Sequence, residues 1–152
     1  MMIASILFGM SVRMNAARAA TLPVKTLSCF GFDDRIAVPT PGFELAGSVG
    51  FLRSSRPARK MPLLFRTDVA ATVSVRATQD GSVWFDYGGE LAKVSEIRFP
   101  GCQDSGHDAQ RPWGVRIGAL HTSKPMCVVL TLTSDVQIAP TRVRLPVGRS
   151  CR

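Results

Sequence analysis

From residue 63 onward, apolar and polar side chains alternate at every second position in one segment after another. In the clearest run, Trp113, Val115 and Ile117 are separated by Gly114 and Arg116. A two-residue period puts alternate side chains on opposite faces of an extended chain, which is typical of strands with one buried face. Strands are therefore expected over residues 69–76, 82–87, 94–99, 113–119, 128–133, 136–138 and 142–147, with shorter ones at 35–38 and 43–45.

The segments between these runs favour turns over helices. Thirteen glycines and ten prolines interrupt the 152 residues, and residues 89–94 form a short helix-compatible run. Asp80-Gly81 predicts a hairpin between the strands on either side of it, because this dipeptide suits a type I′ turn. Pro146 cannot donate a sheet hydrogen bond, so the last strand is expected at an edge. The patterns predict an all-β domain, an antiparallel β-sandwich or partly open barrel.

The N-terminus has the pattern of a leader for export. Residues 3–12 are mostly apolar, and an Ala-Arg-Ala sequence ends at Ala19, as at a signal-peptidase site. We expect a signal-peptide-like leader over residues 1–19, cleavage near Ala19 or Ala20, and a single β-rich domain over residues 20–152. The expected location of the mature protein is secreted or in the cell envelope.

Two other features bear on this location. No basic residue precedes the apolar run, which is unusual for a signal peptide. An organelle transit peptide is the alternative, because the first acidic residue is Asp33 and Arg13, Arg18 and Lys25 precede it. No apolar stretch reaches 18 residues, so no transmembrane segment is expected in the mature chain.

The chain has four cysteines, Cys29, Cys102, Cys127 and Cys151. An even number of cysteines in a small exported chain predicts two disulfides. Of the three possible pairings we favour Cys102–Cys127 with Cys29–Cys151. Cys102 follows one expected strand and Cys127 opens another, while the remaining two lie towards the ends of the mature chain.

Three short motifs contain these cysteines. They are Phe-Pro-Gly-Cys ending at Cys102, Cys-Val-Val-Leu beginning at Cys127, and Gly-Arg-Ser-Cys ending at Cys151. In these motifs the last third of the chain resembles an uncharacterised group of small secreted bacterial β-rich proteins, which share Phe-x-x-Cys, Cys-Val-x-Leu and a terminal Gly-x-x-Cys. The resemblance implies a secreted β-rich domain with paired cysteines, and it implies no activity.

The charge balance favours anionic partners. Lys and Arg number 19 against 11 Asp and Glu, which gives a formal net charge of +8. Such a field attracts polyanions. The basic segment around Arg56, Arg59 and Lys60, and the strand aromatics Trp84 and Tyr87, are the candidate ligand-binding residues. We expect a binding or structural module for an anionic extracellular polymer or envelope component, with no catalysis, no cofactor and no specific nucleic-acid partner.

Two alternatives use the polar segment after Cys102. A zinc-binding module would use Cys102, His107, His121 and Cys127, because two Cys and two His can form a tetrahedral site. A small extracellular hydrolase would use His107 as its base. Ser48 lies in Ala46-Gly47-Ser48-Val49-Gly50, which only loosely matches a nucleophile elbow because Ala46 replaces the first glycine. The elbow also requires a strand before the serine and a helix after it.

Overall fold

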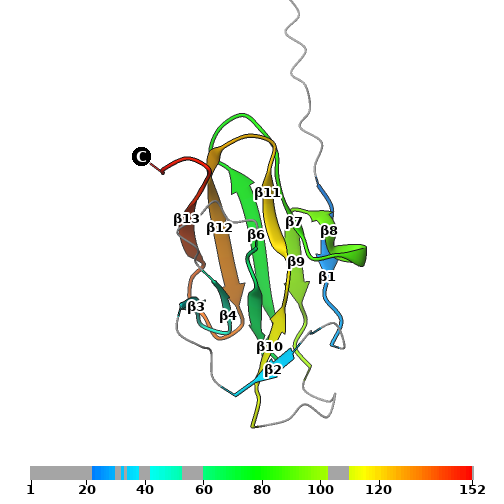
Figure 1. Ribbon diagram of the computed structural model, residues 1–152. Coiled ribbons are helices and arrows are strands. Elements are labelled where there is room, and N and C mark those ends of the chain that lie inside the picture. Colours follow the sequence, from blue (N-terminus) through cyan, green and yellow to red (C-terminus); the bar gives the residue numbers. More distant parts are fainter. Residues whose placement is uncertain are drawn as a thin grey trace, which may run out of the picture.

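The computed structural model describes residues 22–29, 32, 34–37, 42–52, 60–102 and 110–151 (Figure 1). The expected leader and the basic residues Arg56 and Arg59 lie outside this part of the chain. The described elements are one short 3₁₀ helix (Gly89–Leu91) and the strands β1 (Val24–Thr26), β2 (Asp34–Ile36), β3 (Phe43–Ala46), β4 (Val49–Leu52), β5 (Leu63–Arg66), β6 (Ala71–Ala77), β7 (Val83–Asp86), β8 (Ala92–Val94), β9 (Glu96–Phe99), β10 (Trp113–Arg116), β11 (Ala119–Thr122), β12 (Met126–Ser134) and β13 (Thr141–Val147).

The described strands form three sheets. Sheet A has the order β1-β9-β6-β12-β13, sheet B the order β2-β10-β5-β4-β3, and sheet C the order β11-β7-β8. The pairs are antiparallel except for β1 with β9, which run parallel. Sheet B lies over one face of sheet A, and sheet C lies next to sheet B (Figure 1). The all-β prediction is confirmed, and the sheets pack as a sandwich that does not close into a barrel.

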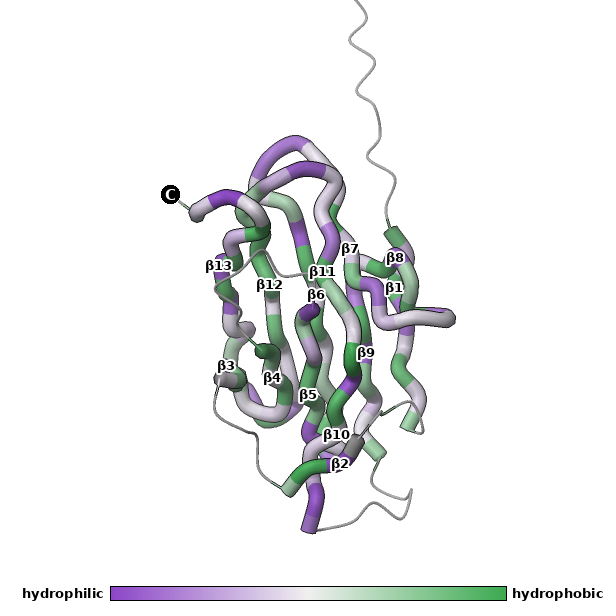
Figure 2. The backbone as a smooth tube through the Cα atoms, in the orientation of Figure 1, coloured by the Kyte–Doolittle hydropathy of each residue, from purple (hydrophilic) through white to green (hydrophobic). Residues whose placement is uncertain are grey.

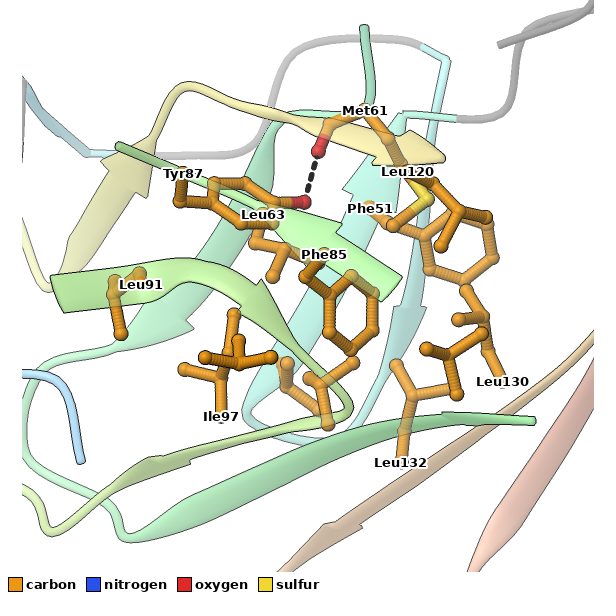
Figure 3. Close-up of a cluster of buried hydrophobic side chains, with 14 of the residues drawn as sticks. Phe51, Met61, Leu63, Phe85, Tyr87, Leu91, Ile97, Leu120, Leu130 and Leu132 are labelled. Carbon is orange, nitrogen blue, oxygen red and sulfur yellow. Dashed lines mark hydrogen bonds between the residues drawn. The ribbon is translucent and has the colours of Figure 1, made fainter. Parts of the chain in front are cut away.

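The apolar faces of the three sheets meet in one core. Alternate residues of the long strands point inward and are fully buried, among them Val73 of β6 and Leu130 and Leu132 of β12. Most of the residues between them are at least partly exposed, although Val129 of β12 is buried. β13 accordingly alternates between apolar and polar along its length (Figure 2). Figure 3 shows the side chains that fill the core, with Phe85 at its centre. The two-residue period of the sequence thus translates directly into an inner and an outer face.

Two connections differ from the sequence-based prediction. The prediction of a hairpin at Asp80-Gly81 is wrong, because β6 belongs to sheet A whereas β7 belongs to sheet C. Residues 113–119 do not form one strand, because β10 pairs with β5 and β11 pairs with β7. The break falls at Ile117 and Gly118, where the backbone N–H of Met61 still donates to Gly118 O at 2.8 Å. A single chain segment therefore joins sheets B and C.

Two further expectations concern β13 and the segment before it. Residues 136–138 form no strand and instead lie in the turn from β12 to β13, where Ile138 is exposed. β12 and β13 are antiparallel neighbours, so the chain must reverse direction between Ser134 and Thr141. The edge position expected from Pro146 is confirmed, because β13 is the last strand of sheet A.

All four cysteines form disulfides, but the favoured pairing is wrong. The bonds join Cys29 to Cys102, with Cα atoms 5.7 Å apart, and Cys127 to Cys151, at 5.1 Å. Because β1 and β9 are parallel, both leave sheet A at the same end, and this brings Cys29 close to Cys102. Cys127 lies at the opposite end of the sheet, at the start of β12, which is antiparallel to β6. A Cys102–Cys127 bond would have to span the length of sheet A.

Candidate functional site

Of the two aromatic candidates, Trp84 remains available at the surface. It lies in β7, half-buried, opposite His121 of β11. The indole and imidazole rings are stacked, with centroids 5.7 Å apart and planes inclined by 10°. Both side chains lie on the outer face of sheet C, because Val83 and Phe85 on either side of Trp84 are buried in the core. A role for Trp84 in ligand binding stays a prediction.

Tyr87, the other aromatic candidate, belongs to the core and is no ligand platform. It is 3% exposed, and its hydroxyl donates to the carbonyl of Met61 (Figure 3). The ring lies against Gly118, where an added Cβ would overlap Tyr87 Cδ1. Burial raises the pKa of Tyr87 well above its ordinary value, because the tyrosinate would lose its hydration. The two-residue period continues through Tyr87, which lies on the buried side with Val83 and Phe85. Choosing it as a ligand residue together with Trp84 therefore overlooked that alternation places the two on opposite faces.

The alternatives built on Cys102 receive no geometric support. Cys102 and Cys127 belong to different disulfides, so neither can supply a thiolate to a shared zinc ion. His121 stacks on Trp84. Within the described part of the chain, no three His, Cys, Asp or Glu side chains gather as metal ligands. His107, the base of the hydrolase alternative, lies outside the described residues.

The segment around Ser48 is a hairpin turn and not a nucleophile elbow. Gly47 and Ser48 join β3 to β4, and Gly47 has a φ of 63°. A positive φ at the first of two central residues is the pattern of a type II′ hairpin turn. Ser48 is fully buried and is followed by a strand, so its hydroxyl faces neither a helix N-terminus nor solvent.

The outer face of sheet A carries a group of arginines that we name the arginine face: Arg76, Arg142 and Arg144. Val129 of β12 pairs with Arg76 of β6 on one side and with Arg144 of β13 on the other. Two strand spacings separate Arg76 from Arg144, so their Cα atoms are about 10 Å apart. Arg142 lies two residues before Arg144 in β13, about 7 Å from it on the same face.

These three cations are not neutralised by the residues around them. All three side chains are exposed, and none makes an ion pair or hydrogen bond with another described residue. Among the described strand residues on this face of sheet A, Glu96 is the acidic one. Its carboxylate forms an ion pair with Arg98 at 2.7 Å. The other outward side chains of β6 and β12 include Thr72, Ser74, Thr131 and Thr133. The face therefore combines net positive charge with hydroxyl groups.

One end of the arginine face continues into a pocket formed with the C-terminal segment. Cys127 lies on the outer side of β12, two residues before Val129, and its disulfide holds Cys151 there. The pocket has a volume of about 380 Å³ and is lined by Thr78, Gln79, Cys127, Arg149 and Ser150. A fourth arginine thus lies next to the three of the arginine face.

Sequence reasoning missed the arginine face although its members lie in strands that were predicted. Arg142 and Arg144 occupy the polar positions of the last alternating run, and Arg76 ends the run over residues 69–76. What the sequence alone does not reveal is that β12 separates β6 from β13 in the sheet. Lys60, the remaining basic candidate, is exposed and lies just before β5, in another sheet.

Comparison with known proteins adds no functional assignment. No protein-family model matches the chain, and neither the curated proteins nor the solved structures contain a significant match. Within the described residues, no helix is long and apolar enough to span a membrane.

Proposed function

We propose that the protein is a secreted or cell-envelope binding module whose arginine face holds an anionic polymer of the envelope or the exterior. The observation that carries this proposal is the exposure of Arg76, Arg142 and Arg144 on one face without neutralising partners among the described residues. Repeated cations on one face of a sheet suit a polymer that carries repeated anions, because several weak contacts then act together.

The other chemistry of this face favours an acidic polysaccharide or wall polymer over nucleic acid. The outward hydroxyls of Thr72, Ser74 and Thr131 can exchange hydrogen bonds with a hydroxylated polymer. The described outward residues of β6, β12 and β13 include no aromatic ring on which a base could stack. Two disulfides are compatible with an oxidising extracellular compartment.

Retention on immobilised heparin, used as a model polyanion, tests the proposal. The triple variant Arg76→Gln/Arg142→Gln/Arg144→Gln removes three charges from the arginine face. We expect it to elute at clearly lower salt than the wild type. The slope of log affinity against log salt should fall by about two, the change expected for three lost counterion-releasing contacts.

The matched control is Arg56→Gln/Arg59→Gln/Lys60→Gln, which removes the same number of charges from the basic segment singled out in the sequence. We expect this variant to elute close to the wild type. Equal losses in both variants would mean that net charge alone causes retention. A loss confined to the control would assign binding to the basic segment, and either result would refute the role of the arginine face.

A further inference from the structure

The pocket beside the Cys127–Cys151 disulfide has the composition of an anion site. Its lining residues are Thr78, Gln79, Cys127, Arg149 and Ser150, and they include one cation and no carboxylate. Its volume of about 380 Å³ is within the range of small-molecule sites. It is also continuous with the arginine face through β12, because Cys127 precedes Val129 by two residues on the same side of the strand.

The fold holds the C-terminal segment over this pocket in three ways. Gly148 has a φ of 69°, which turns the chain back after β13, and an added Cβ would lie 3.2 Å from Pro125. The disulfide then fixes Cys151 to the start of β12. Thr78 strengthens the pocket wall, since its hydroxyl donates to Cys127 O at 2.7 Å.

Within the pocket Arg149 is positioned by Gln79. Arg149 NH1 donates to Gln79 Oε1 at 3.5 Å, and Gln79 Nε2 donates to Pro125 O at 3.4 Å. Because this contact uses one of the five N–H groups of the guanidinium, the others remain able to bind a ligand. Ser150 adds a hydroxyl donor next to Arg149.

We propose that this pocket binds a single phosphate or sulfate monoester group. A guanidinium presents parallel N–H donors that match two oxygens of a tetrahedral oxyanion, and the remaining space accommodates the sugar that carries the ester. The inference rests on the proposed function, because the ester would belong to the polymer that lies along the arginine face. The pocket would add a defined subsite for one ester group to the arginine face, which otherwise attracts the polymer only through its charge.

Calorimetric titration of the full chain with small probes tests the subsite separately from polymer binding. The probes are glucosamine 6-sulfate, glucose 6-phosphate and inorganic phosphate. We expect saturable binding of at least one sugar ester, and the ratio of the two affinities identifies which ester the pocket takes. Arg149→Gln should weaken that binding by about tenfold or more, as expected for the loss of a charge-assisted hydrogen bond.

Lys25→Gln is the matched control, because it removes an equal charge from an exposed position of sheet A that lies outside both the pocket and the arginine face. It should change ester affinity by less than about twofold. The double variant Cys127→Ser/Cys151→Ser releases the C-terminal segment and should abolish ester binding. If the wild type binds none of the three probes, or if Arg149→Gln and Lys25→Gln weaken binding equally, the subsite is refuted. Heparin retention that depends on the arginine face would still support the proposed function in that case.

Discussion

At the scale of single residues, Tyr87 gives the clearest link between packing and a measurable property. It is the only tyrosine of the chain, so its ionisation can be observed without interference from another tyrosine. Burial raises its pKa well above the ordinary value. The folded state therefore favours the neutral phenol, and its contribution to stability is complete below the unfolded-state pKa of about 10. That stability is lost progressively as the pH rises above this value.

We expect an alkaline titration of the folded protein to show no tyrosinate absorbance near pH 10. Absorbance should appear only together with unfolding, monitored by near-ultraviolet circular dichroism. In urea the same residue should titrate at about 10. Tyr87→Phe is the control, because it removes the signal. A folded protein that ionises near pH 10 with unchanged dichroism would contradict the burial of Tyr87 and its hydrogen bond to Met61.

At the scale of elements, alternation predicts strands well but does not predict their neighbours. The strand predicted over residues 69–76 overlaps β6, and residues 142–147 fall within β13. These predictions succeed because side-chain alternation is a local property. The partner of each strand depends on contacts that are distant in sequence. For this reason the sequence wrongly predicts a hairpin at Asp80-Gly81 and the wrong disulfide partner for Cys102. The arginine face was missed for the same reason, since β12 lies between its two strands.

The switch of one segment between sheets B and C gives a prediction at this scale. Gly118 lies beneath the ring of Tyr87, so Gly118→Ala introduces an overlap that the ring must relieve. We expect a loss of about 1–3 kcal/mol in the free energy of unfolding, the usual effect of overpacking a core. Urea denaturation measures the loss in the wild type and in a Tyr87→Ala background. The substitution should cost clearly less where the ring is absent. Equal costs would show that the ring does not restrict this position.

At the scale of the whole molecule, the two disulfides attach the ends of the described chain to opposite ends of sheet A. The bond from Cys29 spans 73 residues and the bond from Cys127 spans 24. The loop-entropy estimate gives about 4 kcal/mol for the first and about 3 kcal/mol for the second. The parallel pairing of β1 with β9 is what makes the longer bond possible, since both strands leave the sheet at the same end.

The connectivity can be tested through the thiol that one substitution sets free. In Cys102→Ser the structure leaves Cys29 without its partner, whereas the pairing favoured from sequence would leave Cys127 free. Alkylation without reduction, followed by tryptic digestion, separates these outcomes, because Cys29 lies in residues 26–35 and Cys127 in residues 117–142. We expect the label on the first peptide, and in Cys151→Ser on the second. Label on Cys127 in the first variant would also remove the physical basis of the anion pocket, because Arg149 would no longer be held beside Gln79 by a neighbouring disulfide.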